Sequence, residues 1–236
     1  MKHGRQRVRK YRVFEGLRIA SCLTFISGYL NAFTYLTQGG RFAGVQSGNV
    51  ILLANQLGQG NFTNTIHFLI PIVFFVCGQF FTYLVKNYFL KRHYPWHLGS
   101  SVIMLCFVLI AVILTPVMSS FYTMAILAFV ASIQVETFRT LRGVPYANVM
   151  MTGNVKNAAF IWFKGIMEKN KELIKIGRNI FITIIGFMLG VICATILSRM
   201  FHEYALVGVI LPMMYVTYKL WQEKNQISTL VCIIKN

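Results

Sequence analysis

The chain has 236 residues, of which 56% are hydrophobic and only 12% are charged. A soluble domain of this length needs far more polar surface, so the composition excludes an ordinary soluble globular protein and predicts a membrane protein. The charge is strongly basic, with 23 Lys and Arg against six acids, all of them Glu, for a net charge of +17. Lys and Arg could neutralise nucleic-acid phosphates. Their positions along the chain show whether these residues are better explained by nucleic-acid binding or by insertion in a membrane.

Six apolar runs are long enough to cross a bilayer, which takes about 20 residues. The sequence therefore predicts an all-α polytopic membrane protein with six transmembrane helices, at residues 17–37, 65–86, 98–115, 119–138, 179–198 and 203–221. Six spans put both termini on one side of the membrane. If that side is the cytoplasm, only Arg41 and Arg199 of the 23 basic residues lie outside. This distribution is expected because loops rich in Lys and Arg stay in the cytoplasm when a membrane protein is inserted. The basic residues then serve as topology signals near anionic lipid, and we expect no nucleic-acid partner.

The chain also contains an internal repeat. A shift of 105 residues places 27–60 on 132–165 without a gap, with eight identities. The core of the match aligns Ser47-Gly48-Asn49-Val50 with Thr152-Gly153-Asn154-Val155. Each half then holds three spans, and because three is odd the halves must point in opposite directions, which predicts the inverted-repeat plan of many secondary transporters.

The segment after the first span of each half is predicted to be re-entrant. Residues 37–60 are too long for a tight turn, yet a further full span would reverse the topology set by the basic residues. We expect a Gly-rich stretch that enters from outside, followed by a short helix over 48–58, and a second copy over 142–165 that enters from the cytoplasm. Non-helical backbone at membrane depth survives only when it is buried in protein or faces a water-filled cavity. Two such segments from opposite faces would meet near the midplane and could form a site.

The candidate binding residues come from these segments and from two spans. Ser47 and Thr152 stand where N-caps of the short helices are expected, and such helix starts are suited to an anion or a polar solute. Plain capping, with Gly for close packing, explains the same residues equally well. The expected substrate-binding set is Asn31, Ser47, Gly48, Asn49, Gln134, Glu136, Thr152, Gly153 and Asn154.

Apart from Glu203, which is the first residue of the last predicted span, Glu136 is the only acid inside a predicted span, and it aligns with Asn31 of the first half. Ionisable groups in spans are costly and usually serve a proton, an ion or a substrate. The alternative is an ion pair with Arg139, one helical turn further on. Gln134 and Asn31 are expected to be polar wall residues of the same site.

Other patterns predict packing and not chemistry. Gly186 and Gly190 form a small-residue stripe of the kind that lets membrane helices approach closely. The five Cys are widely spaced and include no C-x-x-C pair, so neither a metal site nor a disulfide framework is expected. No H-E-x-x-H, phosphate-binding loop or paired carboxylates occur, so we expect no enzyme and no cofactor.

Two motifs carry a family resemblance. The pattern Gly28-Tyr29-Leu30-Asn31-Ala32, followed by Phe42 and Ser47-Gly48-Asn49, with Thr152-Gly153-Asn154 in the second half, resembles the YoaK-type family of bacterial membrane proteins, which carries a domain of unknown function over essentially the whole chain. That resemblance implies six spans in the plasma membrane and supplies no substrate. In the family the first motif usually has Asp where this chain has Asn31, and Thr where it has Ser47, which shifts any ion-coupling role towards Glu136.

We therefore expect one membrane domain, divided into a basic cytoplasmic tail (1–16), repeat one (17–115), repeat two (116–222) and a second cytoplasmic tail (223–236). The expected function is that of a transporter-like protein in a bacterial plasma membrane, moving a small polar or anionic solute through a midplane site. The alternative is a non-transporting scaffold or accessory subunit in which the two short helices only lock the halves together. Membrane lipid is the expected partner, and the sequence does not indicate an oligomeric state.

Overall fold

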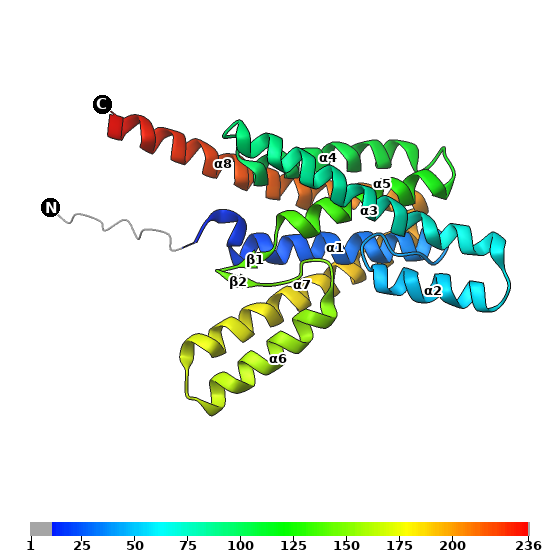
Figure 1. The fold of residues 1–236 in the computed structure, drawn as a ribbon, viewed down its shortest axis with the longest axis horizontal. Coiled ribbons are helices and arrows are strands. Elements are labelled where there is room, and N and C mark those ends of the chain that lie inside the picture. The colour runs from blue at the N-terminus through cyan, green and yellow to red at the C-terminus, as the bar shows by residue number, and fades with distance from the viewer. Residues whose placement is uncertain (1–10, 236) are drawn as a thin grey trace.

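The computed structural model describes residues 11–235, with side chains described for 11–226, so most of the expected basic tail lies outside the described residues. The described chain is almost entirely helical (Figure 1). Its elements in order are η1 (Val13–Glu15), α1 (Leu17–Thr37), α2 (Gln46–Gly58), α3 (Phe62–Lys91), α4 (Trp96–Leu114), α5 (Ser120–Thr137), the two-residue strands β1 (Thr140–Leu141) and β2 (Val144–Pro145), α6 (Met151–Met167), α7 (Lys171–Phe201), η2 (His202–Val209) and α8 (Ile210–Lys235).

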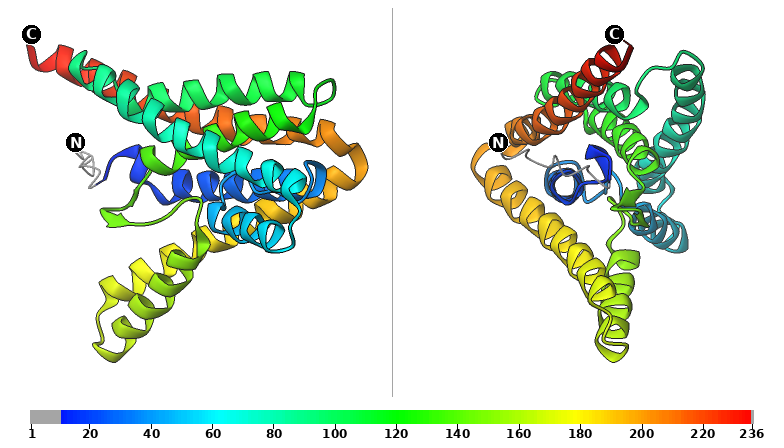
Figure 2. Two further views of the ribbon diagram at one scale, coloured as in Figure 1. Left: turned by 45° about the vertical axis from the view of Figure 1, so that its right-hand side comes forward. Right: turned by 90° about the vertical axis from the view of Figure 1, so that its left-hand side faces the viewer.

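Five helical segments of the described chain are long and apolar enough to cross a membrane. Four of them are α1, α3, α4 and α5, and the fifth runs from 171 to 226 and contains α7, η2 and part of α8. Figure 2 shows the chain turning back at η2, so that α7 and α8 run in opposite directions. His202 stands at this turn with a φ of 49°. The all-α polytopic membrane character predicted from the sequence is confirmed.

Two of the candidate spans are inner helices. In α1, 72% of the most apolar window is buried inside the protein, and in α5 61%, against 22–28% for the other segments. The main hydrophobic core lies between these helices and α4, η2 and α8, around Leu23, Phe33, Val108, Leu127 and Val209. Inner helices face protein and not lipid, which is why α1 and α5 can carry buried polar side chains at low cost.

Two irregular segments interrupt the helical chain, and we name them by their residues. Break 1 (38–45) joins α1 to α2, and break 2 (138–150) joins α5 to α6 and contains the small β1–β2 hairpin. Figure 1 shows α1 and α5 running in opposite directions along the long axis. Break 1 returns towards the middle of the molecule from one end, and break 2 does so from the other.

The backbones of α1 and α7 approach each other closely where the two helices cross. A Cβ added to Gly190 would lie 2.1 Å from the Phe25 carbonyl oxygen, and one added to Gly28 would lie 2.1 Å from the Phe187 carbonyl oxygen. A Cβ on Gly186 would come within 2.9 Å of the Ser21 carbonyl oxygen. The predicted small-residue stripe is therefore confirmed as the contact that brings the two backbones together.

Substituting Gly190 by Ala should force α1 and α7 apart, since no real Cβ tolerates a 2.1 Å contact with backbone. We expect a loss of about 1–3 kcal/mol in the free energy of unfolding, measured as a lower melting temperature in detergent. Gly58→Ala is the control, because nothing lies within 4 Å of its Cβ position. Equal melting temperatures for the two variants would show that the crossing is less tight than described.

Candidate functional site

Asn49 and Asn154 hold the two breaks in the same way. The Asn49 side chain accepts a hydrogen bond from the Phe42 N–H at 2.9 Å and donates one to the Phe42 carbonyl at 2.7 Å. Asn154 accepts from the Ala147 N–H at 3.0 Å and donates to the Ala147 carbonyl. Both side chains are buried. We call each pair of bonds an amide clamp, because one side-chain amide satisfies both polar groups of a backbone residue that lies outside any helix.

The predicted N-caps are wrong. α2 begins at Gln46 and α6 at Met151, so Ser47 and Thr152 lie inside the first turns, and the residues before each helix make no side-chain capping bond. Both hydroxyl residues are exposed. The physical reason is that both helices start two residues earlier than the polar residues suggest. The first turn of α2 is closed by backbone bonds to the Val45 carbonyl.

Asn31 ties break 1 to the inner helix α1. Its side-chain oxygen accepts from the N–H groups of Gly44, at 2.8 Å, and Val45, at 3.1 Å, and its amide donates to the Ser27 carbonyl at 2.8 Å. Thr34 adds a bond by accepting from the Ala43 N–H at 3.1 Å. The predicted wall residue is thus fully occupied in holding backbone.

Break 2 is tied to the protein by a pair of buried amides, Gln134 and Asn148. Gln134 donates to the Leu23 carbonyl of α1 at 3.0 Å and to the Asn148 side-chain oxygen at 3.4 Å. Asn148 donates to the carbonyls of Gln134, at 3.1 Å, and Phe138. Sequence reasoning missed Asn148. A signal was present, since it is a second Asn close to the Thr152-Gly153-Asn154 motif in an otherwise apolar stretch.

Glu136 does not join the other predicted residues. Its carboxylate pairs with Lys86 at 3.5 Å and with Arg139 at 3.4 Å, and its side chain is 29% exposed. It does not line the pocket described below. The ion pair with Arg139, which was the alternative expected from the sequence, is confirmed. The end of α5 turns the Glu136 side chain towards Lys86 of α3, and Gln134 does not line that pocket either.

Arg41, in break 1, is a buried cation that joins three helices. Its guanidinium donates to the Gln38 carbonyl at 2.7 Å, the His67 carbonyl at 3.2 Å and the Ser120 hydroxyl at 2.7 Å. Burial lowers the pKa of Arg41 below its ordinary value, yet an arginine starts so high that it stays charged. These neutral partners fix break 1 against the ends of α1, α3 and α5.

The two breaks touch each other. A Cβ added to Gly44 would lie 2.3 Å from Val149 Cγ1, so these residues, which are equivalent under the 105-residue shift, are in direct contact. Beside this contact is a pocket of about 390 Å³, lined by α1, both breaks, the start of α6 and α7. Its wall is mostly apolar, with polar groups from Asn31, Tyr35, Thr152 and Thr195. It can hold a small molecule that offers a few hydrogen bonds.

No Lys, Arg, His or Glu lines the pocket. Among the described residues, no group of three or more His, Cys, Asp or Glu side chains could hold a metal ion.

The two motif glycines differ in their surroundings although their positions in the repeat are equivalent. A Cβ on Gly48 would lie 2.8 Å from the Phe42 ring, whereas nothing lies within 4 Å of the same position on Gly153. The cause is the residue held in the amide clamp, which is Phe42 in the first half and the small Ala147 in the second.

Gly48→Ala should lower the free energy of unfolding by about 1–3 kcal/mol, because the Phe42 ring must shift. Gly153→Ala should leave it unchanged or raise it by about 0.4–1 kcal/mol, since Ala limits the unfolded chain more than Gly does. Melting temperatures of the two variants in one detergent test this difference. A symmetric response of the two sites would contradict the described packing of Phe42.

The chain was compared with protein families, curated proteins and solved structures. No curated protein and no solved structure matches it. A family match covers residues 19–218, which is most of the chain and includes both breaks, both amide clamps and the pocket between them. The chain belongs to the family described as protein of unknown function, DUF1275.

Proposed function

We propose that the two halves form an inverted repeat with six membrane crossings and that both termini face the cytoplasm of a bacterial cell. The antiparallel course of α1 and α5 supports this arrangement (Figure 1), as does the reversal at η2, which divides the fifth candidate segment into two crossings. The helix contacts support it as well, because α1 of the first half packs on α7 and α5 of the second half packs on α3. The second crossing of each half thus packs on the first crossing of the other.

Within this frame the protein is a transporter-like membrane protein that moves a small polar solute through the pocket at the two breaks. The observation that carries the proposal is the contact between Gly44 and Val149 beside that pocket, with the breaks entering from opposite ends. In transporters built from inverted repeats, interrupted helices form the substrate site near the midplane. The proposal assigns the protein no enzymatic activity.

The lining of the pocket narrows the class of solute. An anion in a site of low dielectric needs a counter-charge or several donors, and no cationic side chain lines this pocket. The amide of Asn31 is already bonded to backbone. An uncharged polar solute therefore fits better than an anionic one, with the exposed hydroxyl of Thr152 as a bonding group.

A second function, that of a scaffold or accessory subunit that transports nothing, is favoured by a different observation. In both Asn49 and Asn154 the side-chain oxygen and the side-chain NH₂ group are hydrogen-bonded to backbone of the same chain. Clamps of this kind stabilise the fold whether or not a solute binds.

The topology predicts where engineered cysteines can be labelled. In a background without native Cys, Gly58→Cys at the end of α2 should react with a membrane-impermeant maleimide on intact cells. Lys171→Cys at the start of α7 should react only after permeabilisation, because six crossings put these two exposed positions on opposite sides. Labelling of both on intact cells, or of neither until permeabilisation, would contradict the six-crossing arrangement.

The pocket predicts which substitutions abolish solute binding. A thermal-shift screen of uncharged sugars, polyols and amides on the purified protein should find a stabilising compound, since a ligand at 100 times its Kd adds about 2.7 kcal/mol. Val191→Trp should abolish this shift and the flux of the same compound into proteoliposomes, because Val191 lines the pocket.

Ile192→Trp is the matched control, because the next residue of α7 is 50% exposed and does not line the pocket. It should keep both the shift and the flux. If no compound stabilises the wild-type protein and none is transported, the scaffold function is favoured. If both Trp variants keep the shift, the solute binds elsewhere.

A further inference from the structure

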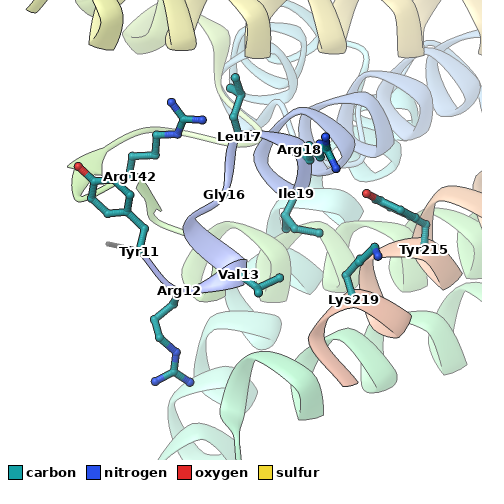
Figure 3. A pocket seen from close by; sticks show the side chains of 10 residues that line it. All are labelled: Tyr11, Arg12, Val13, Gly16, Leu17, Arg18, Ile19, Arg142, Tyr215 and Lys219. Carbon is teal, nitrogen blue, oxygen red and sulfur yellow. The ribbon is translucent and has the colours of Figure 1, made fainter. Parts of the chain in front are cut away.

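A second cavity, of about 450 Å³, lies where α1 begins, and its chemistry is different. It is lined by the segment before α1, the first turn of α1, the turn of the β1–β2 hairpin and α8 (Figure 3). Four cations, Arg12, Arg18, Arg142 and Lys219, line it, and no acidic residue does. We name this cavity the basic crevice.

Three of the four cations have no acidic partner among the side chains that the structure describes. Arg12 is paired with Glu223 at 3.0 Å, and Figure 3 shows its side chain extending away from that of Arg142. Within residues 11–226, the structure gives no ion pair to Arg18, Arg142 or Lys219. Like charges gathered in one cavity repel each other, so an anion that binds there would relieve this repulsion.

The surroundings of Lys219 are polar but neutral. Its ammonium donates to the Gln222 side-chain oxygen at 3.0 Å and lies 6.0 Å from the centre of the Tyr215 ring. Figure 3 shows the hydroxyl end of Tyr215 directed towards the first turn of α1, with the end of Lys219 close to the Tyr215 ring. A phenol hydroxyl beside an ammonium offers a second donor to an oxyanion.

The start of α1 adds to the positive potential of the crevice. The residue before the helix is Gly16, which lines the crevice and has no side chain to cap the helix. The first-turn N–H groups therefore lack a side-chain acceptor, and the helix dipole places partial positive charge there. The three cations and Gly16 at this helix start line the same cavity.

The crevice also lies at the boundary of the apolar region. α1 is a candidate membrane-spanning helix that begins at Leu17, and the apolar side chains of Val13, Leu17 and Ile19 line the crevice beside the cations. An amphiphile with an anionic group could place that group against the cations and its apolar part against the apolar side chains. Cytoplasmic leaflets supply such anions, and cations near the surface attract them.

We propose that the basic crevice binds the phosphate of an anionic lipid headgroup. Arg18 and Arg142 provide donors from two elements that are far apart in the chain, and Lys219 adds a third from α8. A soluble phosphate could bind the same cations but has no apolar part. The experiment therefore distinguishes a lipid phosphate from a soluble phosphate.

The test uses the full chain in nanodiscs of phosphatidylcholine, with and without phosphatidylglycerol. Phosphatidylglycerol should raise the melting temperature of the wild-type protein. The combined variant Arg18→Gln, Arg142→Gln, Lys219→Gln should lose this shift, with affinity falling about fivefold for each cation removed. The charge-matched control is Lys91→Gln, Lys156→Gln, Lys171→Gln, whose three exposed lysines do not line the crevice and which should keep the shift.

A separate arm adds inorganic phosphate or glycerol 3-phosphate to the protein in pure phosphatidylcholine. A shift with soluble phosphate but none with phosphatidylglycerol would overturn the lipid assignment. Equal lipid shifts in the crevice variant and the control variant would overturn the site itself. Single substitutions, with folding checked by circular dichroism, should give graded losses, and a crevice variant that folds and binds like the wild type contradicts the proposal.

Discussion

The structure depends on hydrogen-bond partners for the backbone N–H and C=O groups of the two breaks, which are not helical and lie inside an apolar protein. Each unpaired N–H or carbonyl in such a place costs several kcal/mol, and no water is at hand to replace the bond. Asn49 and Asn154 meet this need with one amide per break, and Asn31 and Asn148 fix the same breaks to their neighbours. The inner helices α1 and α5 can carry the polar side chains that make these contacts, because most of their apolar windows are buried in protein and do not face lipid.

The same constraint links the pocket to the fold. The two breaks can lie against each other at Gly44 and Val149 only because their polar backbone groups are already paired. What remains at the contact is a mostly apolar wall with a few hydroxyls. Charged side chains do not line this pocket. Arg41 of break 1 is bonded to His67 and Ser120, Glu136 forms ion pairs near the surface, and the basic residues of the crevice lie where α1 begins.

Much of the helical plan could be predicted from the sequence, and the limits have physical causes. The apolar run 17–37 coincides with α1, whereas the run 179–198 marks only the apolar middle of α7, Lys171–Phe201, because hydropathy does not detect helical turns that continue into polar residues. The repeat identifies Asn49 and Asn154 as candidate residues but does not indicate their role, since helix starts read from sequence shift by one or two residues. The Arg139 partner of Glu136 could be predicted because it lies one helical turn away, whereas the Lys86 partner could not, because it comes from another helix, 50 residues away.

The amide clamps have a consequence for how such a chain is made. Each joins residues only seven positions apart, so neither needs the opposite half of the protein to form. Contacts this local close early and quickly. The clamp at Asn49 can therefore close while the later part of the chain is still being synthesised, before the long-range bonds of Arg41 to Ser120 and of Gln134 to Leu23 are possible.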